Sequence, residues 1–465
     1  MSLAETHPAA PTVKQSSRQP LTPPYPSPAP ESTTTLQRIA MLRKSAIASW
    51  GPRAYQEDVL KGQFLGRNSF ILNTPETIRH VLIENYENYT RTPVGIRVLR
   101  PILGEDGLLL AEGRAWKHQR RTLAPAFAPR AVAMLTPHMR SATEEMIAGL
   151  RQASNAPVDL REAMQNLALD IAGRTMFSFS TERHGATLRA FVLEYGSKLA
   201  QPHFLDLLLP LSWPSPQDFS RMMFRRRWRR FMSGLIAERR QSAGTDHEPR
   251  DLFDLMVRSQ DPETGEGFSD EQLIDQVSTM ILAGHETTAT ALFWSLYVLS
   301  LDPETQERVA AEALEAGDGP TLDKLKFTRA VFDEVLRLYP PVFLIARAAA
   351  GPDRIAGHDV KPKDVILIAP WLLHRHAGLW DNPKEFRPER FLPGAPPPDR
   401  FAYLPFGVGP RVCIGAQFAI TEGTLALARM IASFRVELVD DRPVIPVGIV
   451  TTQPDHSPLF RIAPR

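Results

Sequence analysis

The hydrophobic residues between positions 116 and 338 recur mainly at intervals of three and four, and proline or glycine separates one such stretch from the next. This spacing is typical of α-helices that bury one face, so we expect the middle of the chain to be helical. The stretch 270–300 contains no proline and lies between Ser269 and Pro303, which mark a helix start and a helix end. At 1.5 Å per residue it predicts a helix of about 46 Å. A further helix is expected over about 415–434.

Two shorter regions have the pattern of β-strands. Residues 56–75 include the run Ser69–Leu72, and residues 347–370 include the apolar run Val365–Ile368. Because β-branched and aromatic residues favour strands, we expect these regions to form a β-rich lobe beside a helical body over about 76–340. The predicted fold class is mainly α with small β-sheets.

The N-terminus has a different composition from the rest of the chain. Residues 1–35 are rich in proline, serine and threonine, and eight of the 42 prolines lie in the first 30 positions. Such a segment buries too little apolar surface to offset the entropy of ordering it. We therefore expect a disordered, proline-rich leader over 1–35 and a single domain over 36–465.

Composition and charge exclude several classes of protein. The chain has 465 residues and is 43% hydrophobic, so it can bury a large core. Its 54 basic and 52 acidic residues nearly balance, which argues against a protein that coats nucleic acid. The one dense basic block, Arg225–Arg230, is interpreted as a solvated helix face. Contact with a membrane surface and attraction of an anionic substrate are the alternatives.

The lone cysteine and the hydrophobic segments indicate in which cellular compartment the protein is expected. Cys413 cannot form an internal disulfide, which fits a reducing cytoplasm. The N-terminus has no apolar signal sequence. The most apolar long window, 277–299, contains His285 and Glu286 at its centre, where ionisable groups are costly in lipid. We expect a soluble, cytoplasmic protein without a transmembrane anchor.

The segment 406–415, with the sequence Phe-Gly-Val-Gly-Pro-Arg-Val-Cys-Ile-Gly, carries the strongest chemical signal. Its glycines and proline predict a rigid turn whose backbone can approach a flat ligand closely. Cys413 lies where a helix is expected to begin, and the helix N-terminus and Arg411 both favour the thiolate, which is the form that ligates iron. A buried, inert cysteine is the alternative.

The pattern Phe-x-x-Gly-x-Arg-x-Cys-x-Gly resembles the haem-ligand loop of the cytochrome P450 superfamily, and the resemblance extends over about 56–465. The segment Phe386–Phe391 is similar to the family's meander motif. The resemblance implies the P450 fold, with a triangular helical body and a long central helix over the haem. It also implies haem b, with Cys413 as the iron ligand and Phe406 and Gly415 in the haem-binding loop.

Glu334 and Arg337 are spaced i, i+3 and share a helix face. By spacing alone they could be an ordinary surface pair worth about 0.2–0.5 kcal/mol. They resemble the family's helix pair, which implies a buried structural triad with Arg390.

Trp116 and Arg120 match the family's Trp-x-x-x-Arg helix. The indole N–H and the guanidinium are suited to a haem propionate, although a half-buried tryptophan and a solvated arginine are the alternative. The resemblance adds Arg347 and Arg411 as propionate partners. His374 and His376 could suggest zinc, but we reject it because alternate residues of an extended segment point to opposite sides.

The expected central helix carries Ala283-Gly284-His285-Glu286-Thr287, which resembles the oxygen-binding segment of the family. Small residues such as Ala283 leave room over the iron. Glu286 and Thr287 are expected to relay protons as the catalytic pair. The alternative for Thr287 is a hydrogen bond to a carbonyl one turn earlier. His285 is expected to point away from the haem and pack.

The reaction implied is monooxygenation with O2, since a thiolate ligand favours O–O cleavage. The chain has no dinucleotide, flavin or iron–sulfur motif, so electrons must come from outside. The resemblance suggests a ferredoxin or flavodoxin with its NAD(P)H-dependent reductase, docked near Arg114, Lys117 and Arg121. A peroxide-using haem-thiolate enzyme and a haem-binding gas sensor are the rival functions.

The substrate pocket is placed by its offset from the motifs. Its residues are mainly apolar, so a hydrophobic small molecule such as a fatty acid, terpenoid or steroid is expected rather than a sugar or nucleotide. We expect a monomer that does not bind nucleic acid. The pocket residues predicted in this way are Leu109, Ala283, Val342, Val450 and Thr451.

Overall fold

The structure is a computed structural model that describes residues 20–64, 66–152, 156–178, 184–203, 205–206, 209–242, 248–317 and 322–465. The α-helices are α1 (Thr35–Lys44), α2 (Pro75–Arg79), α3 (Pro93–Leu103), α4 (Gly113–Leu123), α5 (Pro129–Gln152), α6 (Leu160–Phe177), α7 (Gly185–Glu194), α9 (Asp218–Ser242), α10 (Leu252–Arg258), α11 (Asp270–Leu301), α12 (Pro303–Ala316), α13 (Lys326–Leu338), α14 (Pro370–Leu373) and α15 (Ala416–Ser433). The strands are β1 (Val59–Phe64), β2 (Arg67–Leu72), β3 (Tyr89–Thr90), β4 (Val158–Asp159), β5 (Ile345–Ala349), β6 (Asp353–Ile355), β7 (His358–Val360), β8 (Val365–Ile368), β9 (Phe434–Leu438), β10 (Pro446–Gly448), β11 (Thr452–Pro454) and β12 (Leu459–Pro464).

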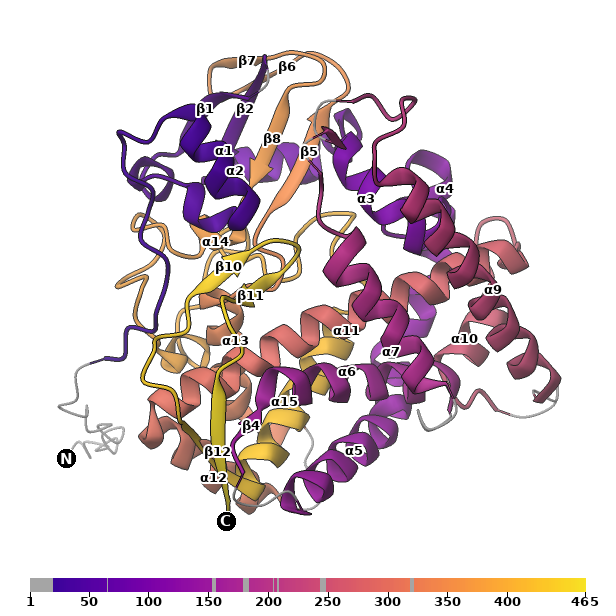
Figure 1. Cartoon of the computed structure of the whole chain (residues 1–465), viewed down its shortest axis with the longest axis vertical. Helices are drawn as coiled ribbons and strands as arrows, with labels where there is room; N and C mark the ends of the chain where they lie inside the picture. Colours follow the sequence, from indigo (N-terminus) through magenta and orange to yellow (C-terminus); the bar gives the residue numbers. More distant parts are fainter. Residues whose placement is uncertain are drawn as a thin grey trace, which may run out of the picture.

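Helix α11 crosses the middle of the molecule, as the proline-free stretch predicts (Figure 1). A capping box starts it: the Ser269 hydroxyl accepts a hydrogen bond from the Gln272 N–H, and the Gln272 side chain accepts one from the Ser269 N–H. Nearly all of its second half, from Thr288 to Leu299, is buried. Helices α6 and α15 pack along it, so α11 is the centre of the helical body.

The main sheet joins segments that lie far apart in the sequence. Its strand order is β1-β2-β8-β5-β3, with β2 and β8 parallel and the other pairs antiparallel. Figure 1 shows it beside the helical body, with the β6–β7 hairpin at its outer end. The mainly α fold class with small sheets is confirmed. Among the described residues, we find no helix with the length and apolarity needed to span a membrane.

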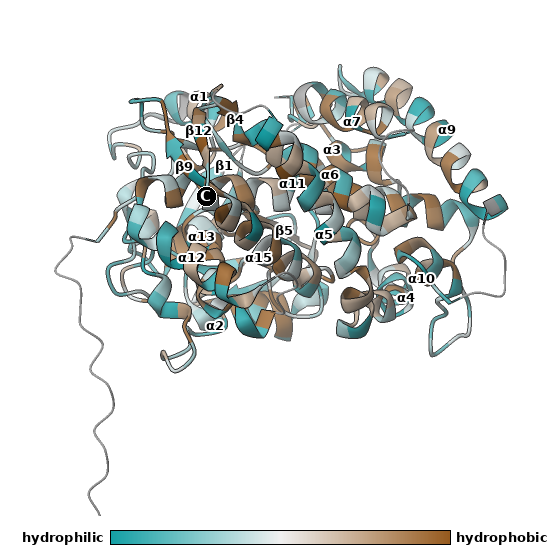
Figure 2. Ribbon diagram, turned by 90° about the horizontal axis from the view of Figure 1, so that it is seen from below, coloured by the Kyte–Doolittle hydropathy of each residue, from teal (hydrophilic) through white to brown (hydrophobic). Residues whose placement is uncertain are grey.

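Helices α7 and α9 form an outer layer at one end of the molecule (Figure 2). The basic block lies on α9, where Trp228 is buried while Arg226 and Arg230 are exposed. Three further arginines of the block are in ion pairs: Arg225 with Glu105 at 3.9 Å, Arg227 with Glu194, and Arg229 with Asp275 at 3.0 Å. The block is thus a helix face that is partly solvated and partly paired.

The prediction of a disordered leader is wrong for residues 20–34. Ala29 is buried, and its N–H donates to the Trp50 carbonyl at 2.8 Å. The Leu21 carbonyl accepts from the Phe386 N–H at 2.8 Å. The Pro24 carbonyl accepts from the Tyr339 hydroxyl at the same distance. These main-chain bonds to the body hold a segment that has no hydrophobic periodicity. Residues 1–19 lie outside the described residues.

Candidate active site

The loop before α15 is shaped by two glycines. Gly407 has φ +70° and Gly409 has φ +81°, which is the left-handed region that side chains disfavour. A Cβ on Gly409 would also lie 2.3 Å from the Leu82 carbonyl oxygen. The turn is closed by the Cys413 N–H, which donates to the Phe406 carbonyl at 2.9 Å. The loop therefore presents Cys413 in a fixed position, and Gly415 caps the helix that follows.

The Cys413 side chain is exposed. Surrounding protein nevertheless raises the pKa of the thiol through burial, whereas a hydrogen bond from the Gly415 main chain and the charge of Arg120 lower it. The expectation that Arg411 supports the thiolate is not met. Arg411 is instead paired with Glu112, and its Nη1 donates to the Ala111 carbonyl at 3.1 Å. The positive charge that lowers the pKa of the thiol is that of Arg120. Arg120 also donates to the Val412 carbonyl at 2.7 Å.

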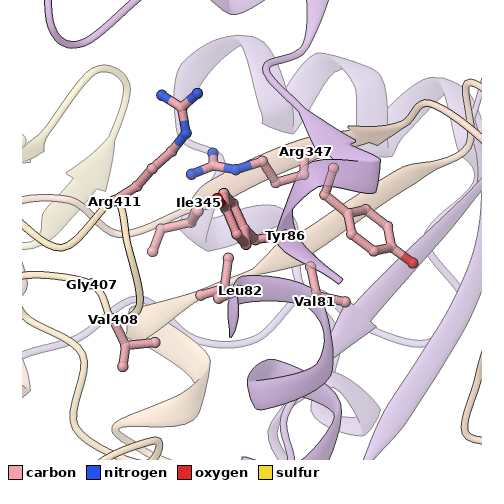
Figure 3. Close-up of a pocket in the computed structure, with 9 residues that line it drawn as sticks. Val81, Leu82, Tyr86, Ile345, Arg347, Gly407, Val408 and Arg411 are labelled. Carbon is pink, nitrogen blue, oxygen red and sulfur yellow. The ribbon is translucent and has the colours of Figure 1, made fainter. Parts of the chain in front are cut away.

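Three arginines gather near the loop, with one carboxylate between them. Arg91, Arg347 and Arg411 repel one another, while Glu112 is the acidic group that offsets them. Burial, followed by this repulsion, lowers the pKa of Arg91 to about 9 and that of Arg347 to about 10. Figure 3 shows the Arg347 and Arg411 side chains close together beside Tyr86 and Leu82. The group carries an excess of two positive charges.

Arg91 is the member of this group that sequence reasoning missed. It follows β3 and belongs to no motif, so only the packing reveals it. Its Nε is buried without a hydrogen-bond partner and lies 3.9 Å from the Glu112 carboxylate. Trp116 lies beside the same group: it is buried, and the Arg411 guanidinium is 4.5 Å from the centre of its ring.

The catalytic pair proposed from the sequence lies at the middle of α11. The Thr287 hydroxyl donates to the Ala283 carbonyl at 2.7 Å, which is the local bond that we gave as the alternative. Glu286 faces the C-terminal hairpin, which is formed by β10 and β11. There it accepts hydrogen bonds from Thr451 at 3.2 Å and from Gln453. Burial raises the pKa of Glu286, against the effect of these two bonds and of Arg161. Gln453 was not found from the sequence, because it lies 167 positions from Glu286.

Four of the five predicted pocket residues are exposed, although they are apolar. Leu109, Val342 and Val450 have exposed fractions of 36, 43 and 44%. Ala283 is exposed as well. Thr451 differs, since it is 4% exposed and its hydroxyl is bound to Glu286. Thr451 thus holds the acid and does not line an open pocket.

Glu334 and Arg337 are fully buried on α13 and are joined by two hydrogen bonds of 2.7 and 2.8 Å. Arg337 also donates to three main-chain carbonyls, those of His374, Pro383 and Glu385. Arg390 lies 3.4 Å from the Glu334 carboxylate. This ion-pair network ties α13 to the segment before the cysteine loop, so the pair is not the surface pair that spacing alone allows.

The two histidines weighed as zinc ligands have other neighbours. His374 accepts from the Leu404 N–H at 2.8 Å through Nε2, and its Nδ1 lies 3.0 Å from the Arg337 carbonyl. Burial lowers its pKa to about 3, so it is neutral. The His376 ring contacts the Gly378 N–H instead. Both follow the short helix α14, so our assumption of an extended segment is wrong.

Two of the three cations proposed for docking a redox partner are paired within the chain. Lys117 lies 3.0 Å from Glu87. Arg121 binds Asp261 at 2.7 Å and Glu263 at 3.1 Å. Arg114 is exposed, and the described part of the chain shows no ion pair for it.

Comparison with known proteins identifies the family. The cytochrome P450 family model matches residues 23–459. The chain belongs to the cytochrome P450 family. Cyclooctatin synthase of Streptomyces melanosporofaciens is 31% identical over 80% of this chain and 81% of its own. Cyclooctat-9-en-7-ol 5-monooxygenase of the same organism is 33% identical over 78% and 79%. The haem domain of cytochrome P450DA, 24% identical, has the same fold, with a TM-score of 0.79 over 96% of this chain and 99% of that one.

This P450 is an oxidoreductase of the monooxygenase class, and the family implies a haem with a cysteine thiolate ligand. The residues present fit such a group. Cys413 is the one thiol of the chain and is accessible at the rigid loop. The arginine group has an excess of two positive charges, which matches the two propionates of a haem. Exposed apolar side chains such as Val342 suit its porphyrin or a substrate beside it.

Proposed function

We propose that this P450 inserts one oxygen atom from O2 into a hydrophobic small molecule. The observation that carries the proposal is the accessible Cys413 thiol on a loop fixed by Gly407 and Gly409, beside an arginine group that Glu112 compensates only in part. Cys413 would ligate the iron of haem b, with Phe406 and Gly415 holding the loop. When bound, the haem supplies the oxidant for the C–H bond.

The residues of the chain have separate tasks in this proposal. Arg91, Arg347 and Arg411 would bind the propionates, with Trp116 and Arg120 at the same edge. Ala283 leaves space on α11. Glu286, whose pKa is raised by burial, can hold a proton and pass it to the hydroxyl of Thr287. For this step Thr287 has to turn from its bond to the Ala283 carbonyl.

The substrate class rests on the pocket and on one relative. The exposed side chains of Leu109, Val342 and Val450 are apolar, which suits a fatty acid, terpenoid or steroid. The relative from Streptomyces melanosporofaciens is named for a substrate that is an alkenol, cyclooctat-9-en-7-ol. Among the three classes, this favours a terpenoid or steroid alcohol over a fatty acid.

Electrons are proposed to come from a ferredoxin or flavodoxin with its NAD(P)H-dependent reductase. Of the three predicted docking cations, Arg114 is the one without an ion pair among the described residues, so it is the strongest candidate contact. We also propose a soluble, cytoplasmic monomer, and the lone cysteine, which cannot form an internal disulfide, fits the reducing compartment.

A spectroscopic and kinetic experiment tests the function. We expect a red-shifted thiolate band in the reduced, CO-treated protein, and its loss in Cys413→Ser. Product formation should then require NADPH with a surrogate ferredoxin and reductase. Product formed equally well with hydrogen peroxide alone would favour the peroxide-using enzyme. A haem-thiolate spectrum without turnover of any terpenoid, steroid or fatty acid would favour the gas sensor.

A further inference from the structure

A polar cavity of about 190 Å³ lies between α6, α7, α11 and the segment that joins β11 to β12. His285 lines it from α11, and this residue is two positions away from both Ala283 and Thr287. Two residues turn an α-helix by about 200°, so Ala283 and Thr287 share one face of α11 and the cavity lies against the opposite face. It is therefore separate from the space proposed for the haem and the substrate.

Four charged side chains line this cavity without pairing with one another. Asp159 and Glu162 are acidic, while Arg161 and Arg189 are basic. Within the part of the chain that the structure describes, none of the four is in an ion pair. Since an ion pair needs a nitrogen and an oxygen within about 4 Å, the cavity keeps the opposite charges apart. A molecule that carries one positive and one negative group can contact both kinds at once.

The two arginines require hydrogen-bond acceptors from an occupant. The Nε atoms of Arg161 and Arg189 are buried and have no hydrogen-bond partner among the described residues. A guanidinium N–H can only donate, and a buried donor without an acceptor is costly. A carboxylate is the best acceptor for such groups, because the hydrogen bonds are then charge-assisted.

His285 requires a hydrogen-bond donor instead. It is 3% exposed, and burial lowers its pKa to about 4, so its ring is neutral and carries a single N–H. A hydrogen bond with the Gln165 main chain acts to raise this pKa, which means that the ring donates to the carbonyl. Nδ1 is buried without a partner among the described residues, so it is the nitrogen left to accept from a hydroxyl or an ammonium group. The expectation that His285 merely packs is therefore incomplete.

The volume of the cavity limits the size of its occupant. At about 30 Å³ per water molecule it holds about six waters, and it is smaller than the about 300–1,000 Å³ of pockets for drug-sized ligands. A molecule of about six non-hydrogen atoms matches this space. Leu193, which is 48% exposed, is the one apolar residue of the described lining, so a large apolar group would find little surface to contact.

We propose that this cavity is a binding site for a small zwitterionic amino acid with a short side chain. Its carboxylate accepts hydrogen bonds from Nε of Arg161 and Nε of Arg189. Its ammonium group donates to Nδ1 of His285 and is offset by the two acidic side chains of the lining. The site is independent of the proposed reaction, because none of its lining residues takes part in that reaction.

Isothermal titration calorimetry of the haem-loaded protein with L-alanine tests the site without turnover. We expect saturable binding of one molecule per chain. L-lactate has a hydroxyl in place of the ammonium group, and ethylamine lacks the carboxylate. Each of the two should bind at least about tenfold more weakly than L-alanine, because a hydrogen bond to a charged group is lost. The haem absorption band should stay in place when L-alanine binds, since the cavity is on the opposite face of α11.

Two variants with matched controls locate the binding. Arg189→Met removes one guanidinium and should weaken L-alanine binding at least about tenfold, while Arg226→Met, exposed on α9, should not change it. Asp159→Asn removes one negative charge and keeps a side-chain oxygen that can cap α6. It should weaken binding about two- to fivefold, as expected for a partly solvated charge, while Asp359→Asn, exposed on β7, should have no effect.

His285→Phe removes the acceptor and should also weaken binding; if it does not fold, Arg189→Met still decides. Any of four results would overturn the proposal: no saturable binding of L-alanine, unchanged binding in Arg189→Met, equal binding of L-lactate and ethylamine, or a shifted haem band, which would place L-alanine beside the iron. An empty titration would mean that the cavity holds water only. An enzyme that binds L-alanine here but forms no product would contradict the proposed function and leave this site standing.

Discussion

Replacing Arg91 with methionine should affect the haem-free and haem-loaded proteins in opposite directions. Arg91 is 17% exposed, and burial together with Arg347 and Arg411 lowers its pKa from 12.5 to about 9. At about 1.4 kcal/mol per pKa unit, holding the charge there costs about 5 kcal/mol in the protein without haem. Methionine keeps an apolar stem and removes the charge. The lowered pKa already includes the attraction of Glu112. Because replacing buried charge by apolar side chains typically gains about 1–4 kcal/mol, we expect the haem-free variant to be about 1–4 kcal/mol more stable than the wild type.

The haem-loaded variant should lose stability instead, because a charge-assisted hydrogen bond to a propionate contributes about 1.5–3 kcal/mol. The assays are urea unfolding of the haem-free protein and the rate of haem transfer to apomyoglobin. Arg114→Met, at an exposed position of α4, is the control and should change neither value. A haem-free Arg91→Met protein that is less stable than the wild type, or unchanged haem transfer, would refute the assignment of Arg91 to the propionates.

Three further changes test the surrounding structure. Glu334→Gln leaves Arg337 as a buried, uncompensated charge, so urea unfolding should show a loss of about 3–5 kcal/mol; a loss below 1 kcal/mol would contradict the buried network. Gly409→Ala requires a Cβ 2.3 Å from the Leu82 carbonyl at φ +81°, so the yield of haem-loaded protein should fall while Gly234→Ala, in open space on α9, has no such effect. Burial raises the pKa of Glu422 from 4.5 to about 8, so the folded state holds a proton that the unfolded state releases, and stability should fall as pH rises from about 4.5 to 8. Glu422→Gln should lack this fall, and an identical pH profile would show that Glu422 is ionised.

The elements that sequence reasoning found have local causes. Helix α11 was predicted within one residue at its C-terminal end, since the absence of proline and the capping residue Ser269 act within the segment itself. The loop around Cys413 could be predicted for the same reason. The positive φ angles at Gly407 and Gly409 are set within a few consecutive residues. Patterns of this kind are visible in a short window of sequence.

The features that sequence reasoning missed depend on contacts across the fold. Arg91 belongs to the arginine group because β3 pairs with β5, which carries Arg347. Gln453 meets Glu286 because the C-terminal hairpin reaches α11. Residues 20–34 are ordered by main-chain bonds to the body, and composition does not report such bonds. No local period or motif encodes these partners.

The arginine group and Glu286 differ in how their charges are balanced, and this difference has a physical reason. The arginine group keeps an excess of positive charge, which a dianionic ligand can neutralise. Glu286, by comparison, is hydrogen-bonded by the neutral groups of Thr451 and Gln453. Arg161 binds the Gln453 amide and acts on Glu286 through its charge, without a hydrogen bond to the carboxylate. A direct ion pair with Arg161 would lower the pKa of Glu286 and leave it ionised through the cycle. With the amide between them, the carboxyl is fixed in place and burial still raises its pKa, which favours the protonated form that a proton donor needs.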